Sequence, residues 1–226
     1  MAIQFKDVSV EFEGRLALSQ VTVTLDQRRI GVIGLNGSGK STFARLLNGL
    51  VKPNHGTVLV NAINPSVDAR AARAQVGFIF SNPDLQIIMP TVAEDVAFSL
   101  RGRGLSAAEV DEQVARALQR FGLAELANEA AHSLSSGQKQ MLALCAVTIA
   151  QPALIVADEP TALLDAVNSA QIKNFLLNQW QGQVVLVTHD LDLVETCDVL
   201  LRFAGGKLVE VGQPAEVLAN YKNSFA

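Results

Sequence analysis

A glycine-rich loop at residues 34–42, with the sequence GLNGSGKST, has the residue types that hold the phosphates of a nucleotide. Glycines let the backbone wrap closely around phosphate oxygens, so that successive N–H groups and the positive end of the following helix face the anion. Lys40 supplies a point charge for the β- and γ-phosphates, and the Ser41 hydroxyl can ligate Mg²⁺. A glycine-rich turn without a ligand is the alternative. The residues expected to contact ATP here are Asn36, Gly37, Ser38, Gly39, Lys40, Ser41 and Thr42.

Two carboxylates, Asp158 and Glu159, directly follow the apolar run at residues 153–157. The run predicts a strand buried on both faces, and the carboxylates then lie at its carboxyl end. Asp158 can hold the Mg²⁺ shell, directly or through water, and Glu159 can polarise the attacking water as a general base. Ordinary solvated acids at a strand end would leave the same pattern.

Two further side chains could reach the same nucleotide. His189 follows the apolar run at residues 184–187, again at a predicted strand end, and from there it could reach the γ-phosphate. Phe12 precedes the phosphate loop and lies next to a turn, where its ring could stack on adenine. A structural histidine and a core phenylalanine are the alternatives. The residues expected to act in catalysis are Lys40, Glu159 and His189.

The segment Leu134-Ser135-Ser136-Gly137-Gln138 lies between the phosphate loop and the carboxylate pair. Each of the three segments can occur by chance or serve another purpose. All three in this order, at these spacings, predict a chain that hydrolyses ATP in order to move something else.

The apolar pattern of the amino-terminal part predicts how the phosphate loop is held. Residues 21–25 alternate between apolar and polar, the period of a strand with one wet face, and with residues 3–5 and 8–12 they indicate a small antiparallel sheet. Residues 30–33 are continuously apolar and predict a buried strand. A helix is expected from residue 40 or 41 to about residue 50.

The rest of the chain predicts an α/β domain with an insertion. Residues 84–150 indicate a mainly helical segment, with a capping box at residues 106–109 and a helix that Gly122 closes. The remaining expected elements are a strand at 153–157, a helix at 166–180, a strand at 184–187, a hairpin at 199–203 and 208–211, and a short helix at 215–220. We therefore predict one domain over residues 1–226, with a mainly parallel core sheet, an amino-terminal antiparallel sheet and an inserted α-helical subdomain.

The composition narrows the class of protein. The net charge of −4 and the pI of about 5.4 argue against a nucleic-acid partner that is held by phosphate neutralisation. Hydrophobic residues make up 49% of the chain, which fits a surface covered by partner subunits or a generous core. No run approaches the roughly 18–20 apolar residues that span a bilayer, and residues 1–7 lack the pattern of a signal peptide. We expect a cytosolic chain in which Cys145 is a buried structural thiol.

Together these residues resemble the nucleotide-binding subunits of ABC transporters, and the resemblance covers almost the whole chain. It implies the P-loop NTPase fold of ABC ATPases, with ATP and Mg²⁺ as cofactors. The corresponding positions are Phe12 for adenine stacking, residues 34–42 for Walker A, residues 134–138 for the signature, Asp158 and Glu159 for Walker B and the catalytic glutamate, residues 161–165 for the D-loop, and His189 for the switch histidine.

The resemblance also implies that two subunits complete each site. ATP on Walker A of one subunit is capped by the signature of the other, which here consists of Ser135, Ser136, Gly137 and Gln138. We therefore expect a second ATPase subunit as partner, in a homodimer.

Two positions depart from the family pattern. Ser136 stands where the signature usually has a second glycine, and its small size should preserve the capping. Ser81 stands where the Q-loop glutamine is expected. Ser81 could still offer an oxygen to Mg²⁺ or water, with shorter reach, while Gln86 could compensate or belong to the subunit contact.

Residues 82–86 and 90–98 are similar to the energy-coupling-factor branch of the family, which imports vitamins and transition-metal ions. The chain ends soon after residues 212–214, without the carboxy-terminal extension of long members, and so resembles the short ATPase of the dedicated biotin importer. The resemblance implies a transmembrane coupling subunit and a substrate-binding membrane subunit as partners, at the cytoplasmic face of the membrane. The coupling subunit is expected to contact an apolar cluster formed by Leu85, Ile87, Ile88, Met89 and Pro90, although some of these residues could instead belong to the core.

Other classes of function remain as alternatives. A cobalt or nickel importer, or another ABC transporter such as an exporter, would share the catalytic residues. A soluble ABC-type ATPase acting on chromosomes or ribosomes usually has two cassettes or a long coiled-coil insertion. This sequence has one cassette, no extended heptads and no basic face.

Overall fold

The computed structural model of the chain describes residues 2–162 and 164–224. The chain forms two compact units, each described by itself below. The sheet unit consists of Met1–Phe78, Ala153–Glu159 and Asn174–Ala226. The helical unit consists of Ile79–Pro152 and Pro160–Lys173.

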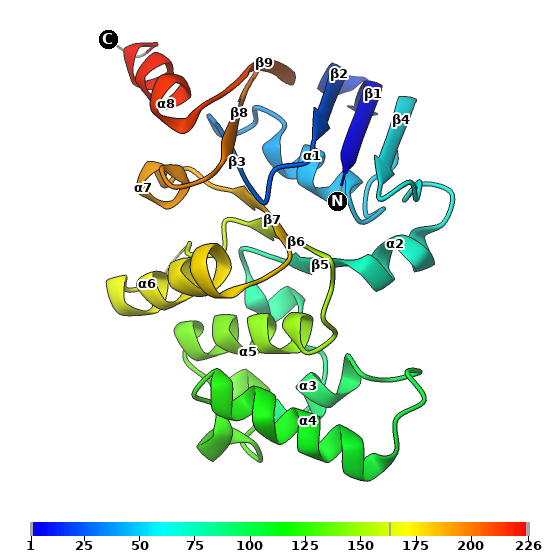
Figure 1. The fold of residues 1–226 in the computed structure, drawn as a ribbon, viewed down its shortest axis with the longest axis vertical. Helices are drawn as coiled ribbons and strands as arrows, with labels where there is room; N and C mark the ends of the chain where they lie inside the picture. The colour runs from blue at the N-terminus through cyan, green and yellow to red at the C-terminus, as the bar shows by residue number, and fades with distance from the viewer. Residues whose placement is uncertain (1, 163, 225–226) are drawn as a thin grey trace. The chain divides into compact units, whose positions relative to one another are not determined.

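The first sheet of the sheet unit is antiparallel and has the strand order β2-β1-β4 (Figure 1). Its strands are β1 (Ile3–Phe12), β2 (Arg15–Leu25) and β4 (His55–Val60). The two strands expected at residues 3–5 and 8–12 are one strand, β1. Shifts of register against β2 interrupt its alternation, and Asp7 between the two predicted segments has a φ of 50°.

The second sheet is mainly parallel and has the strand order β5-β6-β7-β3-β8-β9. Its strands are β3 (Arg29–Gly34), β5 (Val76–Ile79), β6 (Leu154–Asp158), β7 (Gln183–Val187), β8 (Val199–Ala204) and β9 (Lys207–Gly212). Strand β3 pairs in parallel with β7 and β8, and β6 pairs in parallel with β7, whereas β8 and β9 form the predicted hairpin. The predicted α/β fold, with a mainly parallel core sheet and an amino-terminal antiparallel sheet, is confirmed.

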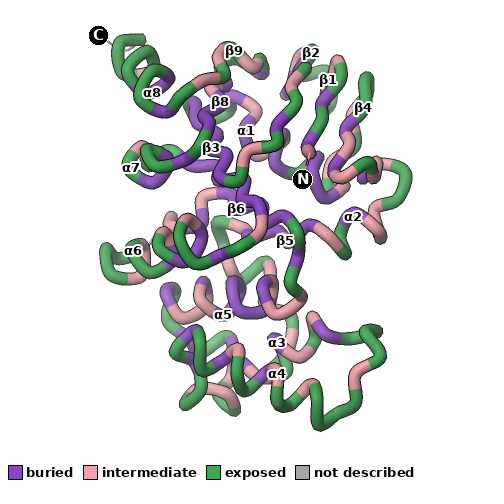
Figure 2. Tube along the Cα trace, in the orientation of Figure 1, coloured by how far each residue is buried: buried purple, intermediate pink, exposed green. Residues whose placement is uncertain are grey.

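Burial explains why the central strands could be predicted from the sequence. Every residue of β3, β6 and β7 is buried, so the strands read as continuous apolar runs (Figure 2). The edge strand β9 instead alternates between exposed and half-buried residues.

The helices of the sheet unit include the one that follows the phosphate loop. They are α1 (Lys40–Leu46), α2 (Ala69–Gln75), α7 (Leu191–Val194), α8 (Pro214–Asn223) and a π-helical turn at Phe175–Gln179. Helix α1 ends earlier than expected. Its residue Phe43 stacks on Phe5 of β1 with ring centroids 4.5 Å apart and lies 5.2 Å from the ring of Phe203 in β8. These contacts hold α1 between the two sheets and so fix the helix that follows the phosphate loop.

The helical unit contains α3 (Val92–Phe98), α4 (Ala107–Arg120) and α5 (Ser136–Thr148), together with most of α6 (Ala166–Asn174). Each of α3, α4 and α5 begins with a capping box, and only the one before α4 was predicted from the sequence. The predicted buried thiol is confirmed, because Cys145 of α5 is fully buried and burial raises its pKa to about 12. Among the described residues, no helix is long and apolar enough to cross a membrane.

The buried residue Arg29 ties the start of β3 to the chain that leads into β7. Its guanidinium donates hydrogen bonds to the carbonyls of Leu177 (2.9 Å), Gly182 (2.8 Å) and Trp180. Its backbone N–H donates to Asp198 Oδ2 at 2.7 Å. A buried charge is tolerated when its hydrogens are bonded, and here the guanidinium hydrogens are bonded to backbone carbonyls.

Replacing Arg29 by alanine should therefore destabilise the sheet unit by roughly 2–4 kcal/mol, because several buried carbonyls lose a charged donor. The measurement is urea denaturation followed by circular dichroism. The exposed Arg15, at the start of β2, provides the matched control. Arg15→Ala should change the free energy of unfolding by no more than about 0.5 kcal/mol. Equal midpoints for the two variants would contradict the role given to Arg29.

Candidate nucleotide-binding and hydrolysis site

The phosphate loop connects β3 to α1, and its glycines are needed for steric reasons. Gly34 has a φ of 147°, and a Cβ added there would collide with the carbonyl of Phe203. Gly39, just before α1, has a φ of 103°, and a Cβ there would lie 2.6 Å from the carbonyl of Ala17. Only glycine allows the loop to lie this close to β2 and β8.

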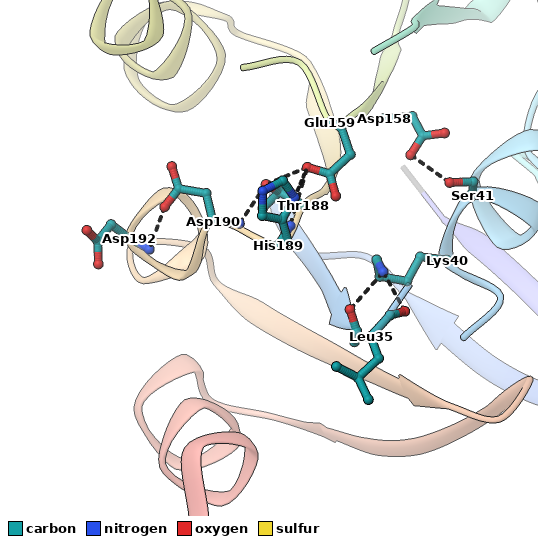
Figure 3. Close-up of polar contacts among 10 residues, drawn as sticks. Leu35, Lys40, Ser41, Asp158, Glu159, Thr188, His189, Asp190 and Asp192 are labelled. Atoms are coloured by element: carbon teal, nitrogen blue, oxygen red, sulfur yellow. Dashed lines mark hydrogen bonds and ion pairs between the residues drawn. The ribbon is translucent and has the colours of Figure 1, made fainter. Parts of the chain in front are cut away.

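Lys40 is buried at the first position of α1. Its Nζ donates hydrogen bonds to the carbonyls of Gly34 (2.7 Å) and Leu35 (3.0 Å), as Figure 3 shows. Burial lowers the pKa of Lys40, while the nearby Glu159 and Asp158 act in the opposite direction. An ammonium has three hydrogens, so one remains for a phosphate oxygen.

Asp158 ends β6 and is buried next to α1. Its Oδ1 accepts a hydrogen bond from the Ser41 hydroxyl at 3.0 Å. Burial raises the pKa of Asp158, and the Ser41 hydrogen bond opposes this shift. A hydroxyl and a carboxylate side by side fit Mg²⁺, which is held by one or two protein oxygens together with phosphates and water.

Glu159 directly follows β6 and has an unusual backbone conformation. Its φ is 53°, and its N–H donates to the carbonyl of Val187 in β7 at 2.8 Å. Its side-chain Oε2 accepts hydrogen bonds from Thr188 Oγ1 (3.1 Å) and from the N–H of His189 (3.3 Å). The same oxygen lies 2.9 Å from His189 Nδ1, an ion-pair contact when the imidazole is protonated. The structure thus brings the predicted base and the predicted histidine into direct contact, a contact that sequence reasoning did not foresee.

A cavity of about 340 Å³ lies beside the phosphate loop, lined by Phe12, Ala17, residues 36–42 and Glu159. The Phe12 residue is 49% exposed, so it does not belong to the core. Its position in the wall of this cavity fits the stacking role. Within the described part of the chain, the buried Ser38 Oγ has no hydrogen-bond partner. Its hydroxyl can therefore donate a hydrogen bond to a phosphate oxygen.

The signature segment lies in the helical unit, where it forms the start of α5. Ser135 is the N-cap residue: its Oγ accepts from the N–H of Gln138 (3.3 Å), and its own N–H donates to Gln138 Oε1 (2.9 Å). Ser136 is the first residue of the helix. A Cβ on Gly137 would collide with the side chain of Asn168 in α6. In the D-loop at residues 161–165, Leu163 lies outside the described residues.

The two candidates for the Q-loop role differ in their surroundings. Ser81 is exposed, whereas Gln86 is half-buried and bonded within the helical unit. Gln86 Oε1 accepts from the N–H of Phe80, and its Nε2 donates to the carbonyl of Ala143, both at 3.4 Å. Sequence reasoning missed the buried Gln140 of α5, whose signal was an amide within an apolar helix. Its Nε2 donates to the carbonyl of Phe80 at 3.3 Å.

The apolar segment at residues 85–90 is partly exposed. Leu85 is 72% exposed and Ile88 is 61% exposed, so these two side chains do not serve the core. The buried carboxylate of Asp95 in α3 holds the segment, because its Oδ1 accepts from the N–H groups of Ile88 (2.9 Å) and Met89 (3.0 Å). The helical unit thus presents apolar side chains on a fixed loop.

Known proteins similar to this chain are ATP-binding proteins of transporters. The ABC transporter family model matches residues 18–162. The chain is 44% identical to the biotin transport ATP-binding protein BioM of Rhizobium etli over 226 residues, which is 100% of both chains. It is 42% identical over 213 residues to the energy-coupling factor transporter ATP-binding protein EcfA1 of Symbiobacterium thermophilum, covering 91% of this chain and 74% of that one.

Among solved structures, the chain is similar to cbiO1 from Clostridium perfringens, which is part of the ABC transporter complex cbiONQ. The TM-score is 0.85 at 28% sequence identity, and the match covers 97% of this chain and 91% of that one. The resemblance inferred from the sequence is thereby confirmed. The chain belongs to the ABC transporter family, as one of its ATP-binding and ATP-hydrolysing subunits.

Proposed function

We propose that the chain is the ATPase of an energy-coupling-factor importer and that its cargo is biotin. The observation that supports hydrolysis is the Glu159 carboxylate, which lines the phosphate-loop cavity and is held there by Thr188 and His189. The cargo rests on the likeness to BioM, which extends over the full length of both chains.

The described residues suggest how ATP is bound. Backbone N–H groups of the phosphate loop, the third hydrogen of Lys40 and the Ser38 hydroxyl face the phosphates, and Phe12 stacks on adenine. Ser41 and Asp158 would hold Mg²⁺, which supplies neutralisation of the charge on the phosphate oxygens.

Glu159 is the general base of this proposal. Within the described residues its hydrogen bonds all end on Oε2, which leaves Oε1 for the attacking water. His189 Nδ1 is engaged with the same carboxylate, so its Nε2 is the ring nitrogen that can turn to the γ-phosphate.

A second copy of the chain completes the site. The Ser135 hydroxyl accepts a hydrogen bond from Gln138, so its own hydrogen stays available for a phosphate of the partner's ATP. Closure of the dimer then depends on ATP favouring the closed state over the open one, since equal binding to both would shift nothing.

The membrane subunits are bound through the helical unit at the cytoplasmic face of the membrane. The exposed Leu85 and Ile88 would contact the transmembrane coupling subunit, because their burial by a partner removes apolar surface from water. A substrate-binding membrane subunit would select the cargo.

Glu159→Gln should bind ATP but lower kcat at least about 100-fold, because an amide cannot accept the proton of water. With saturating ATP and Mg²⁺ this variant should accumulate as a dimer in size-exclusion chromatography with light scattering. Lys40→Ala is the control: it should lose nucleotide affinity and stay monomeric. A Glu159→Gln variant that remains monomeric with bound ATP would refute the two-copy site.

Vesicles that contain the chain with its membrane subunits should take up labelled biotin in an ATP-dependent manner. The Glu159→Gln complex, in the same vesicles, should show background uptake. Uptake of Co²⁺ or Ni²⁺ in place of biotin would support the alternative metal importer. Uptake of none of the three would refute the proposed cargo class.

Gln86→Ala should lower transport-coupled ATP hydrolysis by about 10-fold or more, and Ser81→Ala by less than about 3-fold. The 3.4 Å bonds of Gln86 are long and can be exchanged for contacts with water or phosphate, whereas the serine side chain is short. Hydrolysis and biotin uptake are measured for both variants in parallel. Equal and negligible effects would reject both residues for the Q-loop role.

A further inference from the structure

The residue between β7 and His189, Thr188, is fully buried, and both its main chain and its side chain are engaged. Its N–H donates to the carbonyl of Val32 in β3 at 3.1 Å. Its hydroxyl donates to Glu159 Oε2 at 3.1 Å and accepts from the N–H of Asp190 at 3.0 Å (Figure 3). One side chain therefore links the carboxylate that follows β6 to the loop that follows β7.

We propose that Thr188 is a positioning residue that orients the carboxylate of Glu159 for hydrolysis. This inference rests on the proposed role of Glu159 as general base. A glutamate has flexible side-chain torsions, and an exposed one would sample many orientations. The Thr188 hydroxyl holds Oε2, and Oε1 is thereby directed to the water.

Thr188 is better suited to this task than His189, which also touches Oε2. The His189 side chain is 68% exposed, whereas Thr188 is 0% exposed. Rotation of this exposed ring toward a phosphate would lengthen the contact between its Nδ1 and the carboxylate. The Thr188 hydroxyl stays in place, because the N–H of Asp190 and the pairing with Val32 fix it from two other directions.

The choice of threonine follows from these demands. A β-branched side chain has few χ1 rotamers, so the hydroxyl hydrogen is delivered to one place. Valine has the same shape but no hydroxyl, and it would leave the Glu159 oxygen and the Asp190 N–H without this partner. Serine keeps the hydroxyl and loses only the methyl group.

In the full-length chain, Thr188→Val should lower kcat for ATP hydrolysis about 10- to 100-fold, because a displaced general base is inefficient even when it is present. The Kd for ATP should stay within about 3-fold of the wild type, since Thr188 is not among the residues that line the phosphate-loop cavity. Thr188→Ser should recover kcat to within about 3-fold.

The control for removing a buried threonine hydroxyl is Thr148→Val in α5. Thr148 is also buried, and its hydroxyl donates to the carbonyl of Leu144 at 2.7 Å. This variant should lower the thermal midpoint without lowering kcat. A purely structural role for Thr188 would give it the same behaviour as Thr148.

The proposal is overturned if Thr188→Val hydrolyses ATP at the wild-type rate, or if Thr188→Ser is as slow as Thr188→Val. Should Thr188→Val not fold, Thr188→Cys replaces it, because a thiol is a weak donor of similar size to serine. Equal kcat values for the cysteine and serine variants would then overturn the proposal. A fully active Glu159→Gln variant would instead overturn the assignment of the base itself.

Discussion

The parallel register of three buried strands, β3, β6 and β7, is the constraint on which the proposed hydrolysis site depends. Val32 of β3 pairs with Val187 of β7, and Val187 pairs with Asp158 of β6. Parallel strands end at the same edge of a sheet, so this register places the phosphate loop, the two carboxylates and the Thr188–His189 pair together. A shift by one residue in any strand would move its functional side chain to the other face of the sheet or away from the edge.

Burial at this edge shifts the pKa values of two oppositely charged side chains in opposite directions. It lowers the pKa of Lys40 and raises the pKa of Asp158, since both lose water. Lys40 donates to carbonyls of the phosphate loop, and Asp158 accepts from the Ser41 hydroxyl. Phosphates and Mg²⁺ would supply stronger partners to both groups, so the cost of burying these charges is offset mainly in the ATP-bound state.

Much of this arrangement could be predicted from the sequence. Strands buried on both faces appear as apolar runs, and the loop sequence GLNGSGKST is specific for phosphate binding. Strand β4 and helix α2 were missed, because β4 begins with exposed residues and α2 buries little more than Ala72. The contact of Glu159 with Thr188 could not be predicted, since it requires the register of β6 against β7 and a residue with a φ of 53°.

The signature segment shows why a short motif can be so informative. Ser135 and Gln138 form the capping box that starts α5, and Gly137 lacks a side chain because Asn168 occupies the space. The Asn168 amide cannot easily yield, since its Nδ2 donates to Asp165 Oδ2 at 2.7 Å. These residue types are thus required by the chain's own packing, before any second copy is considered. The same geometry leaves the Ser135 hydroxyl hydrogen at a helix amino terminus, which is where an anion is stabilised. In the proposed dimer the segment therefore meets two demands, local folding and contact with a phosphate, and together they restrict its sequence more than either would alone.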